Sequence, residues 1–447
     1  MSILSKSLVA KAKRNNKIKE HWYKDYNIKR GLRNEDGTGV KAILTEISDV
    51  VGYKEEGGKV IPVDGELIYR GISLKDLVEG FLREGRHGFE ETTYLLMFGE
   101  LPNANELHKF SQSLHEHRGL PSGFVQHLVL PFPSADIMNK LQSNVTVLYR
   151  KDPNPDDISI DNVIKQCVSL IAKFPTIIAY AYQAKRYNLD GKSLFIHEPK
   201  EGLTTAESFL HMLRADMSYT PLEAEILDLM LIIHADHGGG NNSTFTTHCV
   251  TSTDTDTYSA FSAAIGSLKG PKHGGANAKV MAMMDEIKKN VKNWESEGQI
   301  LDYLCKIFRK EKGDGSGLIY GMGHAVYTKS DPRAILLREK AKEFAAVNGR
   351  MDEFNLYDRV AQLTAEAFKE VKKKEAILAP NVDFFSGFVY DNLGFPSDIY
   401  TPLFAMSRVA GWSAHRIEEI ISGKKIIRPA SIYVGPSDKR YLPLQQR

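Results

Sequence analysis

Apolar residues recur at helical spacing through most of the chain beyond residue 70. The clearest case is the run Ile226–Ile233, whose apolar side chains cover every side of a helix. Thr220 and Glu223 form a capping box in front of this run, and Pro221 occupies the first helical position. A helix that is apolar all round must be buried, so this segment predicts the centre of a large helical core.

Other helices also have marked beginnings. Thr204 and Glu207 make a second capping box, and Asp331-Pro332 places a capping aspartate before a proline at the first helical position. A long amphipathic stretch over 397–422 predicts a further helix. Helices therefore account for most of the predicted structure.

Strand-like sequence is scarce. Val60–Tyr69 contains Asp64-Gly65 between short apolar stretches, a pattern that predicts a β-hairpin with its turn at these two residues. The hydrophilic stretches near 151–160 and 310–317 are typical of surface loops. No alternation of strands and helices occurs elsewhere, so the expected fold class is all-α, with a minor β-hairpin near the N-terminus.

Composition limits the partners and the compartment. With 447 residues, 42% of them hydrophobic, the chain is long enough for two or three domains. Lys plus Arg number 58 against 56 Asp plus Glu, and the net charge of +2 offers no general attraction for nucleic acid or an anionic membrane. Cys167, Cys249 and Cys305 form no CxxC pattern, which indicates a reducing, cytoplasmic location. No apolar run is expected to span a membrane.

The first 33 residues are strongly basic, with Lys11, Lys13 and Arg14 among them. A transit peptide and a nucleic-acid-binding segment are both alternatives for such a stretch. It is rich in Lys rather than in Arg and Ser, has no hydrophobic signal core and includes acidic residues. These features favour a solvated tail that leads into a first helix.

Four glycine-punctuated segments each present one side chain suited to acid–base chemistry. They are His237 in HADHGGGNNST, His273 in KGPKHGGAN, His324 in GMGHAVYTKSDPR and Asp383 in NVDFFSG. The segments lie tens of residues apart, so only tertiary folding can bring them together. Taken alone, each favours an ordinary turn or helix end.

The neighbours of three residues indicate what each could do. His273 precedes a helix, whose positive N-terminal end favours a neutral ring able to donate to an oxyanion. Asp383 stands among apolar residues, where desolvation would raise its pKa, although a helix N-cap is the alternative. Arg333, in the first turn after Asp331, suits a carboxylate or phosphate, or else pairs with Asp331 at the surface.

A metal site is a further alternative. His234 and His237, with Asp236 between them and His248 downstream, could bind zinc or iron. Spacing of i, i+3 at a helix end is not the HExxH arrangement, and no glutamate is placed as a third ligand. We therefore expect no metal and no bound cofactor. Gly321-x-Gly323 also lacks the third glycine of a dinucleotide fingerprint.

Five motifs, taken in order, resemble those of citrate synthases. They are HADHGGGNNST, LKGPKHGGAN, GMGHAVYTKSDPR, NVDFFSG and FAMSRVAGWSAH. Weaker similarities include LIYRGISLKDL and RPASIYVG, so the resemblance extends over residues 50–436. Each motif is weak alone, but their order and spacing together are a strong signal.

The resemblance implies an acyltransferase that condenses acetyl-CoA with oxaloacetate and hydrolyses citryl-CoA to citrate and CoA. It implies Asp383 as the base and His273 as the donor to the enolate oxygen. It also implies His324 as the acid that polarises the ketone, with His237 as a further donor to the substrate.

Binding roles follow from the same resemblance. The arginines that would hold the substrate carboxylates are Arg333, Arg408 and Arg428, the last from the second subunit of a homodimer. The residues that would contact coenzyme A are Ile319, Gly321, Gly323 and Lys329. The implied fold has a large helical domain, 1–274 with 389–447, and a small one, 275–388, that closes over oxaloacetate.

Two alternatives stay open within this resemblance. A 2-methylcitrate synthase would use propionyl-CoA, and one extra methylene is worth only about 1–3 kcal/mol in a pocket. A protein that binds CoA without catalysis could share the fold, although the full set of histidines, aspartate and arginines speaks against it. Gly238 departs from the family pattern, in which glutamate is common at this place.

Overall fold

The computed structural model describes residues 6–57, 59–436 and 439–446. It divides into two compact units, residues 43–426 and residues 1–42 with 427–447. The described elements of the second unit are α1 (Lys6–Asn15), α2 (Glu20–Asp25) and the 3-10 turns Arg30–Leu32 and Leu444–Gln446. All side chains over residues 7–15 are exposed, as expected for a solvated basic segment.

The larger unit contains a small antiparallel sheet in the order β1 (Ser48–Glu56), β2 (Lys59–Tyr69) and β3 (Ile72–Ser73). The predicted turn at Asp64-Gly65 is wrong, because both residues lie inside β2. Gly65 is needed for another reason: a Cβ there would lie 2.0 Å from the carbonyl oxygen of Ser330. The glycine lets a loop from far along the chain approach the strand.

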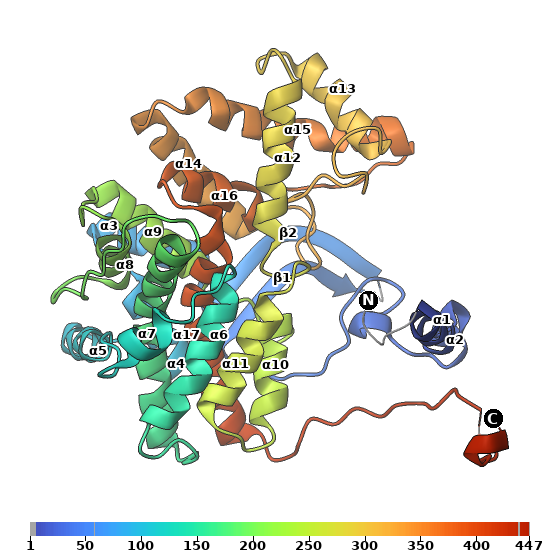
Figure 1. Ribbon diagram of the computed structural model, residues 1–447. Helices are drawn as coiled ribbons and strands as arrows, with labels where there is room; N and C mark the ends of the chain where they lie inside the picture. Colours follow the sequence, from blue (N-terminus) through green and yellow to red (C-terminus); the bar gives the residue numbers. More distant parts are fainter. Residues whose placement is uncertain (1–5, 58, 437–438, 447) are drawn as a thin grey trace. The chain divides into compact units, whose positions relative to one another are not determined.

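The rest of the regular structure described in this unit is helical, which confirms the all-α prediction (Figure 1). The first helices are α3 (Leu74–Glu84), α4 (Phe89–Phe98), α5 (Ala104–Glu116), α6 (Ile137–Leu148), α7 (Ile160–Asn188), α8 (Thr205–Leu213), α9 (Pro221–His234), α10 (Asn242–Thr251) and α11 (Thr257–Leu268). The others are α12 (Ala276–Asn290), α13 (Glu297–Phe308), α14 (Pro332–Val347), α15 (Met351–Lys372), α16 (Val382–Asn392) and α17 (Tyr400–Ser422).

Helix beginnings occur where the sequence predicts them. Thr204 with Glu207 forms the capping box of α8, and Thr220 with Glu223 forms that of α9. The Asp331 side chain accepts a backbone N–H at the start of α14. Side chains close in sequence therefore set these boundaries.

Helix α17 differs from its prediction. A 3-10 turn covers Ser397–Ile399, and the α-helix begins only at Tyr400. Most side chains from Tyr400 to Ile417 are buried, because α4, α7, α9 and α10 pack around the helix. The amphipathic interpretation is thus wrong over most of its length, and α17 carries Arg408 into the interior.

Helix α7 is long and apolar enough to cross a membrane by length and composition, contrary to the expectation from the sequence. Of its most apolar 18-residue window, 83% is buried inside the protein. Helices α6, α8 and α17 pack against it. Burial on this scale is typical of a central core helix.

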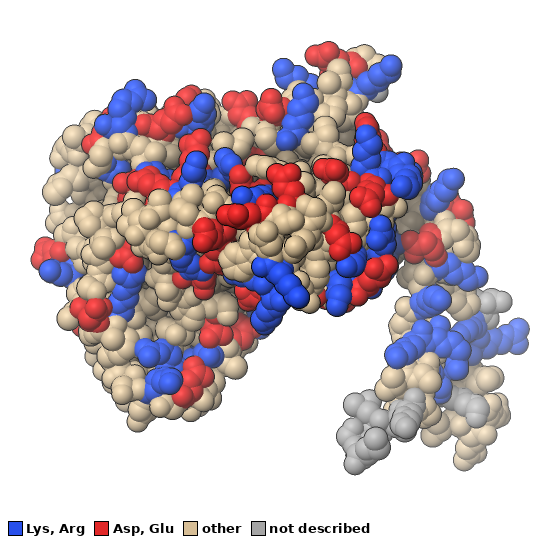
Figure 2. Space-filling model, turned by 90° about the horizontal axis from the view of Figure 1, so that it is seen from above, with Lys and Arg blue, Asp and Glu red and all other residues tan. Residues whose placement is uncertain are grey.

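Helices α12, α13 and α15 lie together at one end of the larger unit in Figure 1, with α13 packed on α15 and α12 on α16. Helix α14 links them to the rest, since it contacts α16, α9 and β2. The boundaries at 274/275 and 388/389 stay a prediction. Acidic and basic side chains are interspersed over the face seen in Figure 2, as the small net charge predicts.

Candidate active site

Two segments far apart in the sequence, 319–324 and 379–383, run side by side. Three hydrogen bonds to backbone carbonyl oxygens join them: from the Gly323 N–H to Ala379 (2.7 Å), from the Asn381 N–H to Gly321 (2.9 Å) and from Asn381 Nδ2 to Gly323 (2.8 Å). This pairing places His324 beside the beginning of α16, which carries Asp383.

The loop that follows His324 is anchored on the sheet. A Cβ added to Gly52 of β1 would lie 2.2 Å from the loop backbone, and one added to Gly65 of β2 would lie 2.7 Å from the Tyr327 ring. The Thr328 hydroxyl donates to the carbonyl oxygen of Gly52. Missing side chains on the strands thus let the loop and its tyrosine lie against the sheet.

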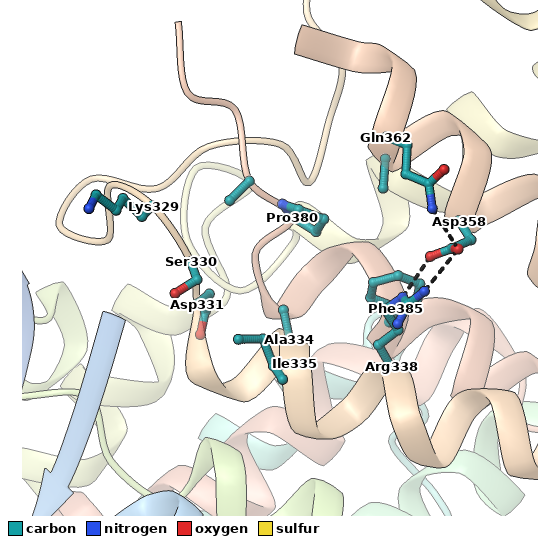
Figure 3. Close-up of a pocket in the computed structure, with 12 residues that line it drawn as sticks. Lys329, Ser330, Asp331, Ala334, Ile335, Arg338, Asp358, Gln362, Pro380 and Phe385 are labelled. Atoms are coloured by element: carbon teal, nitrogen blue, oxygen red, sulfur yellow. Dashed lines mark hydrogen bonds and ion pairs between the residues drawn. The ribbon is translucent and has the colours of Figure 1, made fainter. Parts of the chain in front are cut away.

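A pocket of about 310 Å³ opens beside this loop (Figure 3). Of the predicted coenzyme A contacts, Lys329 lines it, together with Ser330 and the ion pair of Arg338 with Asp358. Ile319 is buried. The remaining predicted contacts, Gly321 and Gly323, already use carbonyl groups to bond the neighbouring segment.

Arg333 lies in the first turn of α14 and is buried with its partner Asp331. The Asp331 carboxylate accepts hydrogen bonds from its Nε at 3.0 Å and its Nη2 at 2.7 Å. The pair exists, but in the interior rather than at the surface. Burial opposes the charge, yet Asp331 raises the pKa of Arg333 above its usual value. The guanidinium lies 5.5 Å from the centre of the Tyr327 ring.

His324 presents a defined proton donor. Its Nδ1 accepts the backbone N–H groups of Val326 (3.0 Å) and Tyr327 (3.1 Å), so the proton of the neutral ring lies on Nε2. The ring of His237 is 5.2 Å from that of His324, and the Tyr327 ring is 4.7 Å from His324 and 5.5 Å from His237. The three rings form one compact cluster.

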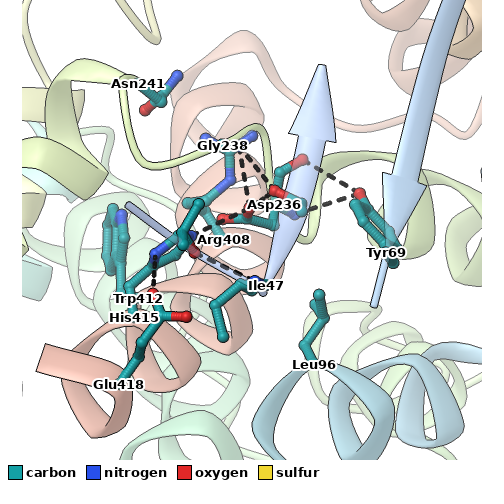
Figure 4. A network of polar contacts seen from close by, with 12 residues as sticks. Ile47, Tyr69, Leu96, Asp236, Gly238, Asn241, Arg408, Trp412, His415 and Glu418 are labelled. Carbon is teal, nitrogen blue, oxygen red and sulfur yellow. Dashed lines mark hydrogen bonds and ion pairs between the residues drawn. The ribbon is translucent and has the colours of Figure 1, made fainter. Parts of the chain in front are cut away.

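His237 stands just after the end of α9, and its neighbours fix the backbone there. The Asp236 carboxylate accepts hydrogen bonds from the Gly238 N–H at 3.0 Å and from the Ser48 hydroxyl, and the Tyr69 hydroxyl donates to the Asp236 carbonyl at 3.1 Å (Figure 4). Gly238 has a φ of 78°, which L side chains rarely adopt. Glycine at this position, where the family commonly has glutamate, therefore suits this backbone.

Arg408 reaches the same place from α17. Its Nε donates to the carbonyl oxygen of His234 at 2.8 Å, and its guanidinium lies 4.8 Å from the centre of the Phe404 ring. Burial lowers the pKa of Arg408 to about 10, so the side chain is still charged at pH 7. Phe404 also contacts the ring of His273, at 6.2 Å between ring centres.

His273 lies in the turn before α12. Its Nε2 is 3.1 Å from the Ser243 hydroxyl, which donates to Asn241 Oδ1 at 3.0 Å and accepts a hydrogen bond from Trp412 Nε1 at 3.2 Å. Burial and the charge of Arg408 lower the pKa of His273 to about 4. The ring is therefore neutral near pH 7.

Asp383 lies in the first turn of α16 but does not cap it. Asn381 is the cap, since its side chain accepts the Asp383 N–H at 3.0 Å, so the N-cap interpretation of Asp383 is wrong. Its carboxylate accepts no hydrogen bond from any described residue. Burial raises the pKa of Asp383 to about 6, against the opposing charge of Arg333. An unengaged carboxylate with a raised pKa is a stronger base.

Several donors of this cluster are buried without a hydrogen-bond partner among the described residues: Nη1 and Nη2 of Arg408, Nε2 of His237 and the hydroxyl of Tyr327. Such groups are rare, because leaving one unsatisfied costs about 1–3 kcal/mol. Burial, followed by the charge of Arg333, lowers the pKa of His237 well below its usual value. A small anion with several oxygens would satisfy these donors.

The structure thus brings most of the predicted site residues together. They are His237, His273, His324, Arg333, Arg408 and Asp383. Arg428 is exposed and belongs to the other unit, so its role stays a prediction. Sequence reasoning missed Tyr327 and Ser243. Both stand inside motifs singled out in the sequence, Tyr327 in that of His324 and Ser243 in that of His237, but nothing in the second motif signals the contact with His273.

The predicted metal alternative does not form. His234 uses its Nδ1 to donate to the carbonyl oxygen of Met230 at 2.9 Å. Within the described part of the chain, the one group of three close metal-ligand side chains is His248, His415 and Glu418, which includes neither His234 nor His237.

Comparisons with known proteins agree with this geometry. Residues 33–430 match the family described as "Citrate synthase, C-terminal domain". Citrate synthase of Corynebacterium glutamicum is 34% identical over 411 residues, which cover 89% of this chain and 88% of that protein. The 2-methylcitrate synthase 1 of the same organism is 33% identical over 430 residues, which cover 95% of this chain and 99% of that protein.

A solved structure extends the similarity to the fold. Citrate synthase from Thermoplasma acidophilum, in a ternary complex with carboxymethyl coenzyme A and oxaloacetate, has a TM-score of 0.76 and 27% sequence identity, covering 94% of this chain and 99% of that one. Similarity in sequence and in fold extends over nearly the whole of this chain and of its relatives, so the chain belongs to the citrate synthase family of acyltransferases.

Proposed function

We propose that this enzyme joins the methyl carbon of acetyl-CoA to the keto carbon of oxaloacetate and hydrolyses the citryl-CoA formed, as in the tricarboxylic acid cycle. One observation carries the proposal. Asp383, a carboxylate without hydrogen-bond donors and with a raised pKa, and His273, a neutral imidazole, lie in one cluster with buried donors that lack partners. Acetyl-CoA serves as a substrate, and the reaction needs no redox step and no further cofactor.

The acetyl group is activated from two sides. A thioester methyl is a poor carbon acid, so its proton leaves only if the enolate oxygen is stabilised at the same time. Asp383 takes the proton, and the electron pair of the C–H bond moves towards the thioester oxygen, to which His273 donates. The Ser243 hydroxyl, 3.1 Å from His273 Nε2, holds the ring in place beside that oxygen.

The keto acid is held and polarised by the other residues. Arg333 and Arg408 bind its carboxylates, and His237 donates a further hydrogen bond. The enolate carbon attacks the keto carbon while His324 Nε2–H protonates the keto oxygen, which yields citryl-CoA. Water then attacks the thioester and releases citrate and the CoA thiol. Closure of domain 275–388 over the larger domain would keep the enolate from water.

Release of free thiol tests this reaction. With oxaloacetate present, we expect thiol release from acetyl-CoA, and slower release from propionyl-CoA by up to about 200-fold, the most that one methylene provides. Without oxaloacetate no thiol should appear. No release with either thioester would contradict catalysis altogether.

A second candidate, 2-methylcitrate synthase, is favoured by the 33% identity to such an enzyme over 95% of this chain. A larger kcat/KM with propionyl-CoA than with acetyl-CoA would establish it. Both candidates share the residues and their roles, so the comparison of the two thioesters decides between them.

Removal of the Tyr327 hydroxyl should weaken oxaloacetate binding. The hydroxyl is buried and has no partner among the described residues, and a hydrogen bond to a charged group is worth about 1.5–3 kcal/mol. In Tyr327→Phe the KM for oxaloacetate should rise by about 10- to 100-fold. The KM for acetyl-CoA should stay unchanged, and the unliganded variant should be at least as stable as the wild type.

Tyr258→Phe is the matched control. Tyr258, on helix α11, is equally buried, but its hydroxyl already donates to Asp152 at 2.8 Å. This control should lose stability and keep its KM for oxaloacetate. An unchanged KM in folded Tyr327→Phe would exclude its hydroxyl from the substrate site.

We also propose that the enzyme is a cytoplasmic homodimer in which Arg428 of the second subunit completes each site. Citrate has three carboxylates, and the larger unit supplies Arg333 and Arg408 to the cluster. The three cysteines are free, which suits a reducing compartment.

Subunit mixing tests the shared site. Arg428→Gln and Asp383→Asn should each be nearly inactive alone. Mixed dimers of the two contain one intact site, so random mixing should restore about a quarter of wild-type activity. Mixed dimers that form and stay inactive would show that Arg428 acts within its own chain.

A further inference from the structure

A line of hydrogen-bonded side chains leads from the residue before His237 towards the protein surface. It joins Asp236 to His415 of α17, His415 to His248 of α10, and His248 to Glu419 of α17. The Nε2 of His415 lies 3.2 Å from Asp236 Oδ2. The two imidazoles approach to 3.0 Å, from His415 Nδ1 to His248 Nε2. Both rings are fully buried.

The carboxylates at the two ends decide where the ring protons lie. Asp236 also accepts hydrogen bonds from Ser48 and Gly238, and Glu419 lies 2.7 Å from His248 Nδ1. A carboxylate only accepts, so each outer ring nitrogen carries hydrogen. If both imidazoles are neutral, each has one N–H, and the inner nitrogens of the two rings, 3.0 Å apart, face each other with lone pairs. This arrangement is unfavourable without a cation.

Glu418 brings a third lone pair to the same place. Its Oε2 lies 3.8 Å from His415 Nδ1 and is buried with no hydrogen-bond partner in the described part of the chain. Its other oxygen accepts the Glu46 N–H at 2.8 Å, which fixes the side chain. The donor atoms of His248, His415 and Glu418 all lie within 4.8 Å of one another.

Charged side chains lie around these three atoms. The carboxylates are those of Asp236, Glu418 and Glu419, and two arginines lie near them: Arg408, beside Asp236, and Arg70, near Glu418. A cation at the three donor atoms would be stabilised by these carboxylates.

We propose that His248 Nε2, His415 Nδ1 and Glu418 Oε2 bind a divalent transition-metal ion of the zinc type, with water as the fourth ligand. Zinc commonly takes such nitrogen and oxygen ligands, and bonds of about 2.0 Å place two ligands of a tetrahedron about 3.3 Å apart. The observed 3.0 Å between the ring nitrogens is close to that value. Asp236 and Glu419 act as the carboxylates that orient metal-bound imidazoles.

The ion has a structural role. It ties α10 to α17 and, through Asp236, to the backbone that carries His237. It therefore braces the wall of the oxaloacetate site and takes no part in the reaction. No metal is expected from the sequence, and of the residues in the metal alternative considered there only His248 belongs to this group.

Cobalt titration tests the site directly. The full-length enzyme is freed of metal with a chelator, dialysed and titrated with Co²⁺, whose visible absorption reports four-coordinate binding. The wild type should bind one Co²⁺ per chain, release it to Zn²⁺ and unfold at a higher temperature with either ion. His248→Gln and Glu418→Gln should lose both signals, and Glu419→Gln should bind about 10- to 100-fold more weakly.

His211→Gln is the control, because it removes a histidine from another pair, with His197, and should behave as the wild type. Residue 418 lies near the end of α17, and glutamine there still accepts the Glu46 N–H. Glu418→Gln therefore tests metal binding by this side chain even if His248→Gln fails to fold. If the wild type bound neither Co²⁺ nor Zn²⁺, the two ring nitrogens would be held together by a shared proton instead of a metal ion, and the proposal would be overturned. Equal binding by Glu418→Gln would reveal an adventitious ion only and overturn it as well.

Discussion

Asparagine in place of Asp383 will lower the turnover number by about 10²- to 10⁴-fold, the contribution expected of a general base. The amide keeps the shape of the side chain but cannot take the methyl proton. Asp331 cannot substitute, because Arg333 holds its carboxylate. Thiol release at saturating oxaloacetate measures the loss. Asp302→Asn, on an exposed carboxylate of α13, should keep wild-type activity.

The raised pKa of Asp383 gives the same variant a second signature. The carboxylate has a pKa of about 3.9 in the unfolded chain and about 6 in the folded one. Folding therefore binds the proton, and stability falls as pH rises from about 4 to about 6, by up to about 3 kcal/mol. Asp383→Asn should be more stable than the wild type at pH 8 and nearly equal at pH 4.

Catalysis has the opposite pH dependence, since the base acts only when ionised. The kcat/KM of the wild type for acetyl-CoA should rise with pH up to about 6 and then level off. Denaturant unfolding at the two pH values and the kinetic profile together check the assignment. Identical unfolding curves of variant and wild type at pH 8 would contradict a raised pKa of Asp383 in the folded protein.

Glutamine in place of Arg408 will weaken oxaloacetate binding by about 2–5 kcal/mol, roughly 30- to 5000-fold. The guanidinium is fully buried, and two of its nitrogens have no partner among the described residues, so its charge is available to a substrate carboxylate. Titration with oxaloacetate measures the effect, and the KM for acetyl-CoA should change far less. Arg408→Lys keeps the charge without the planar fork and should fall in between.

Arg416 is a matched control on the same helix. It is equally buried, but its guanidinium is bonded to Thr257, Thr251 and the carbonyl oxygen of Thr255. Arg416→Gln should lower stability and leave the oxaloacetate affinity of the folded protein unchanged. If the two variants weakened binding alike, the effect at Arg408 would be structural and its role as a carboxylate ligand would be wrong.

Local signals in the sequence predict local structure well. The helix beginnings at Thr204, Thr220 and Asp331 depend on side chains that bond backbone two or three residues away. The same reasoning fails at Asp64-Gly65, because the contact that requires the glycine comes from a distant loop. Periodicity also misjudges α17, whose surroundings are set by helices from four other parts of the chain.

The candidate site divides in the same way. Motifs identify Asp383 and His273, but the free carboxylate of the first and the Ser243 partner of the second depend on packing that no single segment encodes. Tyr327 lies within a recognised motif, and only its buried hydroxyl without a partner marks it as a site residue. The contact between His248 and His415 joins two helices far apart in sequence, so the spacing of residues along the chain cannot predict it.

In the proposed mechanism, one set of residues acts on the acetyl group while another holds the keto acid. Direct titration of oxaloacetate into folded Asp383→Asn tests it. We expect a dissociation constant within about twofold to threefold of the wild-type value, the change that about 0.5 kcal/mol produces, because Asp383 serves the other substrate. Loss of oxaloacetate binding by this variant, while it remains folded, would contradict the division of roles.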